Sequence, residues 1–182
     1  MKEITPFVHT NSWAMFHGVF LGVWGILSMV AYYASVVSDS SWSITAMLMM
    51  VSSPLVAYFL SKHFREVCGE VEFAFGRGFT HTLLMGMYAT LWVALMVFVY
   101  LHYFDNGSFF DAYEVKVSSE EVIQELKRVG VWEIYEQSGG VRKMINVLRS
   151  FGAANYAALI IYFSLIVGPL FSLIIGGLLK RK

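Results

Sequence analysis

The chain has 182 residues, of which 57% are hydrophobic, 16% aromatic and only 14% charged, and its formal net charge is zero. With a mean hydropathy of +0.60, this composition excludes an ordinary soluble domain, and no basic patch suits a nucleic-acid partner. The sequence therefore predicts an all-α integral membrane protein in a lipid bilayer.

Four uncharged segments predict four transmembrane helices. Each exceeds the roughly 20 residues that a helix needs to cross about 30 Å of hydrocarbon. The two-residue alternation of a membrane barrel is missing. We place the spans in a single membrane domain, at residues 13–37, 42–62, 79–103 and 154–178.

The first two spans form a predicted hairpin. The first is about twice as long as a signal-peptide core and has no clear cleavage site, so we interpret it as a retained helix. It carries His17 and the pair Gly18 and Gly22, whose spacing of four residues permits close packing of helices. Pro54 lies inside the second span and predicts a kink, because proline removes a backbone donor.

A charged segment, EVEFAFGRGFTH, leads into the third span and contains Glu70, Glu72, Arg77 and His81. These side chains could serve as acid, base and electrophile. The alternative is a solvated helix end, in which the acids complement the helix dipole and Arg77 reaches the headgroups. We favour the solvated helix end. We also predict no metal and no cofactor, because the sequence lacks the ligand spacings of known metal sites.

His17 and His81 are the two ionisable candidates within the spans, each near the same end of its helix. Such a residue is a candidate functional position by default. A neutral, hydrogen-bonded structural histidine and a proton-binding or ligand-binding histidine are both open. The spans hold no Asp, Glu, Lys or Arg at mid-membrane, which argues against a charge-coupled pump.

An amphipathic helical insertion is predicted between the third and fourth spans, at residues 105–150. It opens on a turn signal, Asp105-Asn106-Gly107-Ser108, and Ser118 to Glu121 has the pattern of a capping box. Gly139-Gly140 precedes a second amphipathic helix, which is typical of a helix in the headgroup region. The insertion could cap the bundle, dock a partner or cover a lipid-facing cavity.

The last two spans repeat features of the first two. Gly86 lies in the third span, and the fourth carries Gly168, Pro169, Ser172 and Gly176. HGVFLGVW aligns with HTLLMGMY, and SPLVAYF aligns with GPLFSLI. One interpretation is two tandem hairpins related by an axis along the membrane normal. The alternative is chance alignment of apolar segments.

The insertion holds six basic and eight acidic residues, and long loops weigh less in setting orientation. Outside it, lysine and arginine gather at two places. These are the connection between the second and third spans, with Lys62, Arg65 and Arg77, and the C-terminal Lys180-Arg181-Lys182. The positive-inside rule places both in the cytoplasm. We therefore expect both termini to be cytoplasmic and the insertion to be extracytoplasmic.

Three features together resemble one known family. They are FAFGRGF from Phe73 to Phe79 before a span, the charged amphipathic insertion, and a last span that ends in GGLLKRK. The chain resembles the bacterial integral-membrane family catalogued as domain of unknown function 4199. The resemblance implies a four-span inner-membrane protein with a link to cell-envelope biogenesis, and it transfers no catalytic residue.

Two functions compete at this point. The first is a non-catalytic membrane subunit or scaffold that packs against a protein partner or in a homo-oligomer. The second is a small dimeric transporter or lipid-handling protein, with kinks at Pro54 and Pro169 beside its pathway. A polar cavity lined by Ser53, Thr82, Thr90 and the two histidines would favour transport, and a filled, dry bundle centre would contradict it. A membrane enzyme ranks third.

Overall fold

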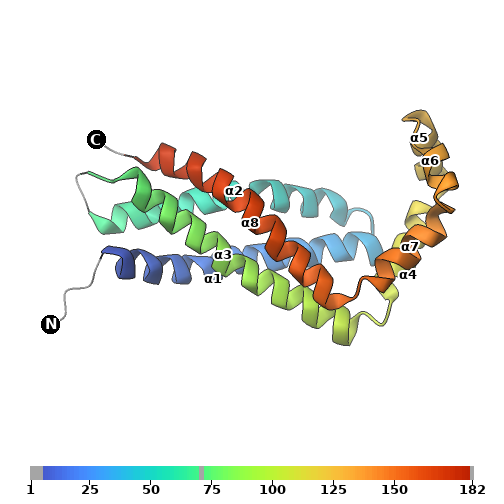
Figure 1. The fold of residues 1–182 in the computed structure, drawn as a ribbon, viewed down its shortest axis with the longest axis horizontal. Coiled ribbons are helices and arrows are strands. Elements are labelled where there is room, and N and C mark those ends of the chain that lie inside the picture. The colour runs from blue at the N-terminus through green and yellow to red at the C-terminus, as the bar shows by residue number, and fades with distance from the viewer. Residues whose placement is uncertain (1–5, 70–71, 181–182) are drawn as a thin grey trace.

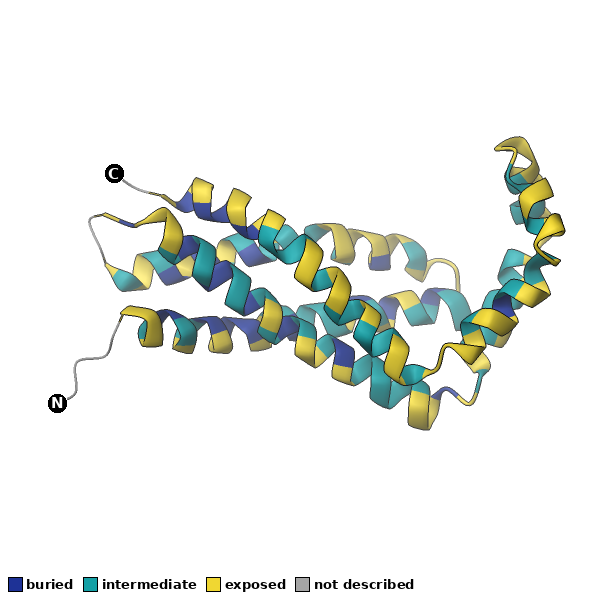
Figure 2. Cartoon of the chain, in the orientation of Figure 1, coloured by how far each residue is buried: buried dark blue, intermediate teal, exposed yellow. Residues whose placement is uncertain are grey.

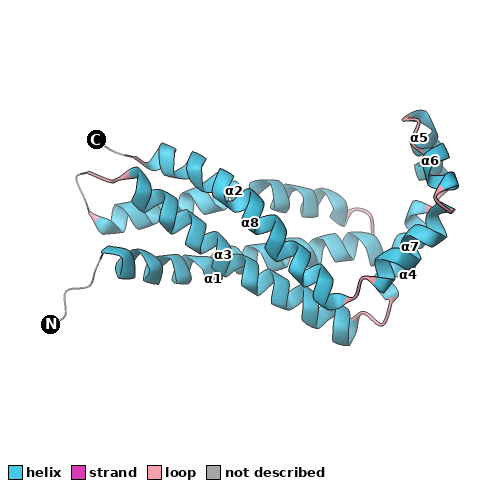
Figure 3. Ribbon diagram, in the orientation of Figure 1, coloured by secondary structure: helices cyan, strands magenta, loops and turns pink. Residues whose placement is uncertain are grey.

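The computed structural model describes residues 6–69 and 72–180, so Glu70, Arg181 and Lys182 lie outside the described residues. Four long helices form an elongated bundle, and no strand is present in these two ranges (Figures 1 and 3). The long helices are α1 (Pro6–Val37), α2 (Trp42–Cys68), α3 (Phe75–Val99) and α8 (Ala153–Leu179). Each is long and apolar enough to cross a membrane, which confirms the predicted fold class.

The helices extend beyond the expected spans where their ends become polar. α1 begins at Pro6 rather than near residue 13, and α2 continues to Cys68 rather than ending near residue 62. Polar helix ends can continue into the headgroup region, where water satisfies their side chains. Pro54 and Pro169 lie inside uninterrupted helices, α2 and α8 respectively. The kinks stay a prediction.

The insertion consists of four short helices, of which the sequence predicted two. They are α4 (Ser108–Val117), α5 (Glu120–Arg128), α6 (Trp132–Gln137) and α7 (Gly140–Ser150), and a π-helical segment, Tyr100–Phe104, precedes them. The predicted capping box is wrong. Ser119 rather than Ser118 occupies the N-cap of α5, and its side chain makes no capping bond.

Asp105 instead provides the clearest helix cap in the insertion. Its buried carboxylate accepts hydrogen bonds from the backbone N–H groups of Gly107 at 3.1 Å and Phe109 at 2.9 Å. Such bonds satisfy donors that a helix start otherwise leaves unpaired. Asp105 therefore sets where α4 begins.

The bundle is built on a central pair of helices. α1 and α3 pack closely along each other, α2 packs mainly against α1, and α8 packs mainly against α3. α2 and α8 meet only along a short stretch. We call the end near Pro6 and Leu179 the termini end, and the opposite end the loop end (Figure 1). Buried positions gather toward the termini end (Figure 2), and the large buried side chains include Phe64, Phe73 and Met85.

Small residues permit close contacts between the helices. A Cβ added to Gly18 would lie 2.6 Å from Cβ of Tyr88, and one added to Gly176 would lie 2.9 Å from the backbone nitrogen of Phe79. Gly22 is nearly as close to α3, because an added Cβ would lie 3.0 Å from Cβ of Trp92. Ser172 is also buried. These contacts are typical of membrane helices that associate through small residues.

Gly86 and Gly168 do not make the close helix contacts that we expected of them. Nothing lies within 4 Å of a Cβ added to Gly86, and beyond its own helix Gly168 has only Cδ1 of Leu83, at 4.0 Å. The spacing of four residues places glycines on one helix face, but it does not say whether another helix covers that face. Both residues lie beside open space.

Alanine substitutions separate the packed glycines from the open ones. Gly18→Ala and Gly176→Ala should each destabilise the protein by about 1–3 kcal/mol, because a close-packed helix contact must widen. Gly86→Ala should be neutral or stabilise by up to about 1 kcal/mol, since alanine is the better helix former. Thermal unfolding of the detergent-purified variants checks this. Equal losses at all three positions would contradict the packing described above.

Candidate functional site

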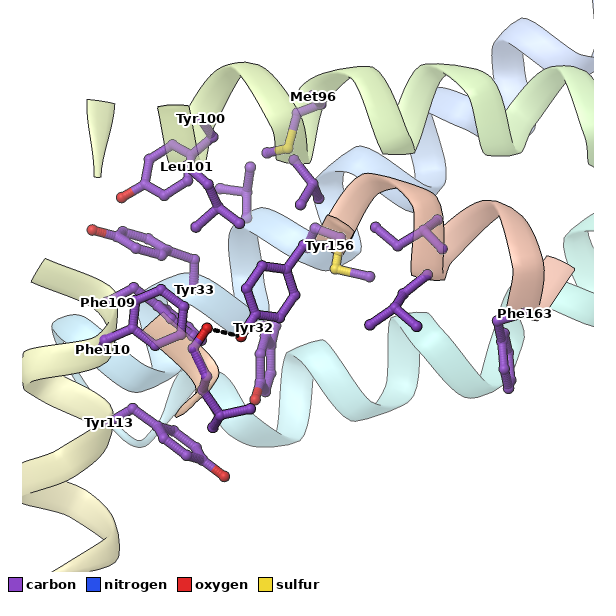
Figure 4. Close-up of a pocket in the computed structure, with 16 residues that line it drawn as sticks. Tyr32, Tyr33, Met96, Tyr100, Leu101, Phe109, Phe110, Tyr113, Tyr156 and Phe163 are labelled. Carbon is purple, nitrogen blue, oxygen red and sulfur yellow. Dashed lines mark hydrogen bonds between the residues drawn. The ribbon is translucent and has the colours of Figure 1, made fainter. Parts of the chain in front are cut away.

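A cavity lined by aromatic rings lies at the loop end of the bundle. It has a volume of about 650 Å³ and is lined by α1, α3 with its π-helical segment, α4, α7 and α8 (Figure 4). Tyr32 and Tyr33 come from α1, Phe109 and Phe110 from α4, and Tyr156 from α8. The Tyr156 hydroxyl donates to the Leu148 carbonyl at 2.7 Å, which ties α8 to the short helix α7 above it. We call this space the aromatic cavity.

A second hollow, the α2–α8 groove, lies between these two helices with α1 and α3 behind it. Its volume is about 710 Å³, and Gly86 and Gly168 are among its lining residues. Met29, Ile160 and Phe163 line both the groove and the aromatic cavity. The two hollows therefore adjoin and extend from the loop end into the membrane-spanning part of the bundle.

The hydroxyl groups that line the groove are hydrogen-bonded within the chain. Thr82 donates to the Gly78 carbonyl at 2.9 Å, Ser172 to the Gly168 carbonyl at 2.8 Å and Ser53 to the Met49 carbonyl at 3.1 Å. Thr90 donates its single hydrogen to the Gly86 carbonyl at 2.8 Å or to the Ser164 hydroxyl at 2.6 Å. Because four of these five hydroxyls donate to acceptors within the chain, the groove presents a largely apolar surface to an occupant.

A chain of buried polar side chains joins α1, α2 and α3 nearer the termini end. Nδ1 of His17 lies 3.1 Å from Nε2 of His81, and Nδ1 of His81 lies 3.1 Å from the Ser61 hydroxyl. Ser61 in turn lies 2.9 Å from the Thr82 hydroxyl. All four side chains are buried. The two candidate histidines, predicted to lie at equivalent depths, are in direct contact.

The direction of this chain follows from the number of hydrogens. A hydroxyl has a single hydrogen, and Thr82 donates its own to the Gly78 carbonyl. Ser61 must therefore donate to Thr82, and its oxygen accepts from Nδ1–H of His81. Nε2 of His81 then accepts from Nδ1–H of His17. Both rings are consequently Nδ1–H tautomers in their neutral forms.

This arrangement distinguishes the two histidines chemically. A proton can bind at Nε2 of His17 without breaking any bond of the chain. A proton at Nε2 of His81 would break the link to His17 and place a charge beneath the Phe64 ring, which stacks on His81 at 4.2 Å. Among the described residues, no group of three or more His, Cys, Asp or Glu side chains is arranged to hold a metal ion.

A family model described as "Protein of unknown function (DUF4199)" matches residues 13–181, which is nearly the whole chain. The chain belongs to this family. The match confirms the resemblance seen in FAFGRGF, the insertion and the last span. No curated protein and no solved structure matches the chain.

The charged segment at the start of α3 in this DUF4199 protein divides between solvent and the bundle, and the expected reach of Arg77 to the headgroups stays a prediction. Glu72 is exposed, whereas Arg77 turns toward α1, with its side chain 3.2 Å from Nδ1 of His9 and 3.4 Å from the Thr10 hydroxyl. The Arg77 guanidinium also lies over the Phe64 ring at 5.6 Å. Arg77 thus joins α3 to α1 beside the buried histidines. Glu70 lies outside the described residues.

Sequence reasoning missed the aromatic cavity of this DUF4199 protein. The signal was the density of aromatic residues at the loop end, in YLHYF before Asp105 and SFFDAY after Gly107. Such residues are also typical of an ordinary membrane interface. Which of them face one another depends on where α4 begins, and the sequence did not reveal the Asp105 cap.

A serine substitution tests the buried chain. Ser61→Ala removes the acceptor for Nδ1–H of His81 and should destabilise the protein by about 1–3 kcal/mol, because a buried donor loses its partner. Ser52→Ala is the matched control. Ser52 is on the same helix, and among the described residues its hydroxyl bonds to the Met49 carbonyl of α2 alone. Thermal unfolding compares the two variants.

Equal destabilisation by the two serine substitutions would contradict the role given to Ser61. The ¹⁵N chemical shifts of the histidine rings provide a second readout. They should report Nδ1–H tautomers for both His17 and His81 under conditions where both rings are neutral, and an Nε2–H tautomer at either ring would reverse the assigned direction.

Proposed function

We propose that this DUF4199 protein is a non-catalytic lipid-handling membrane protein that binds an apolar lipid chain in the α2–α8 groove and the aromatic cavity. The observation that carries the proposal is the continuity of the two hollows, which share Met29, Ile160 and Phe163. Each hollow has a volume within the roughly 300–1,000 Å³ of small-molecule sites.

The chemistry of the lining supports a lipid rather than a polar solute. The expected transport pathway combined Ser53, Thr82 and Thr90 with two accessible histidines. The groove contains the three hydroxyl residues, but their hydroxyls are hydrogen-bonded within the chain, and His17 and His81 are buried rather than part of the lining. An acyl chain needs no hydrogen-bond donor, so this lining suits it.

The polar end of the lipid would lie at the loop end. The tyrosine-rich aromatic cavity is covered there by α4 and the amphipathic helix α7, and aromatic rings with a polar tip favour the headgroup level. We further propose that the protein resides in a bacterial inner membrane with both termini in the cytoplasm. The cations Lys62, Arg65 and Arg77 at the termini end support this orientation. The loop end would then be extracytoplasmic.

Filling the groove tests the proposal. Gly86→Leu and Gly168→Leu each place a side chain into the open space described above, and should lower the amount of lipid that co-purifies with the protein several-fold. Gly177→Leu is the matched control, because Gly177 is exposed on α8 and nothing lies within 4 Å of an added Cβ. Native mass spectrometry of protein from mild detergent measures the bound lipid.

Equal lipid retention in all three leucine variants would contradict lipid binding in the groove. Lipid binding would be supported if Gly86→Leu and Gly168→Leu lose bound lipid while Gly177→Leu keeps it, and if the thermal stability of all three stays close to that of the unsubstituted protein.

A second candidate is a membrane subunit, for which the same groove receives a transmembrane helix of a partner. The small residues Ser53, Ala57, Gly86 and Gly168 along its walls favour this occupant, since helices in lipid associate at such surfaces. The same purification distinguishes the two. A stoichiometric protein that is lost from the leucine variants, with no bound lipid, would replace the lipid proposal with the subunit role.

A further inference from the structure

Opposite charges separate within the insertion. Residues 118–138, which contain α5 and α6, hold five acidic and two basic side chains, a net charge of −3. Residues 139–150, which contain α7, hold three basic side chains and no acidic one, a net charge of +3. We call residues 118–138 the acidic arm. Adjacent parts of one insertion thus carry equal and opposite charge.

Contacts within the described chain leave much of this charge unpaired. Glu125 pairs with Arg128 at 2.6 Å within the arm, and Arg149 of α7 pairs with Asp111 and Glu114 of α4. The other charged side chains of the two helical segments are exposed, and in the ranges that the structure describes they form no ion pair. These side chains are Glu120, Glu121, Lys127, Glu133, Glu136, Arg142 and Lys143.

The acidic arm also presents an uncovered apolar surface. Val129 is 59% exposed and Ile134 is 66% exposed. α5 packs against α4 and α6, and α6 packs against α7, so in the part of the chain that the structure describes the main packing partners of the arm belong to the insertion. Figure 1 shows α5 and α6 at the far end of α7, away from the loop ends of α3 and α8. The arm therefore extends sideways from the bundle, where another molecule can reach it.

We propose that a second copy of this chain covers the arm, with the acidic arm of each protomer against the basic α7 of the other. A two-fold axis produces this pairing twice, because each protomer offers both charges. An anionic lipid surface is a poorer occupant, since it repels a segment of net charge −3. The dimer lies in the insertion and does not depend on the proposed lipid site between α2 and α8.

Charge reversal in trans tests this contact in the full-length protein. The first variant combines Glu121→Lys, Glu133→Lys and Glu136→Lys, and the second combines Arg142→Glu and Lys143→Glu. Each variant alone should lose self-association by about tenfold or more, because like charges meet at both symmetric contacts. Mixing the two variants should restore a heterodimer, because one of its two contacts keeps the original charges and the other pairs the two reversed segments, which are again opposite in sign. Light scattering in mild detergent measures the loss of self-association. Co-purification of the two variants through two different affinity tags measures the heterodimer.

The control is Lys62→Glu, which reverses a partly exposed charge at the opposite end of the molecule and should leave the dimer unchanged. A monomeric unsubstituted protein, a dimer that both variants keep, or a mixture that fails to pair would each overturn the proposal. The proposal would also be overturned if the second variant lost binding to vesicles of anionic lipid while its oligomeric state stayed the same, because α7 would then contact a lipid surface rather than a second copy of the chain. Bound lipid, measured in the same samples, should be unchanged, which keeps this test separate from that of the groove.

Discussion

The close contact between α1 and α3 is the constraint on which the rest of the structure depends. Gly18 and Gly22 allow the two helices to approach, and at this distance His17 and His81 form a direct hydrogen bond of 3.1 Å. Apolar side chains gain little by leaving lipid for a helix contact, so close packing and polar bonds between helices decide the arrangement. Ser61 then adds α2 to the same buried chain.

The position of the groove follows from this central pair. α2 is held by α1 and α8 by α3, so the two outer helices share only a short contact and leave space between them. The termini end is closed by Phe64, Phe73 and other buried side chains, whereas the aromatic cavity lies at the loop end. A bundle that is closely packed at one end and hollow at the other has room for a lipid chain without opening its core.

The four spans could be predicted from hydropathy alone because their uncharged segments are long and well separated. The contacts between them could not. Gly18 and Gly86 occur in similar sequence settings, yet one packs against α3 and the other lines open space, since helix rotation decides which face is covered. The same limit applies to His17 and His81, whose equal depth could be predicted but whose direct bond could not.

The most direct test of lipid handling is a structure of the full-length protein in a lipid nanodisc. Lipid handling predicts a continuous tube of density that passes from the aromatic cavity, beside Met29, Ile160 and Phe163, into the α2–α8 groove. The density should be better ordered there than that of the lipid around the rest of the bundle. A groove closed by its own side chains, or filled by a protein helix, would contradict lipid handling.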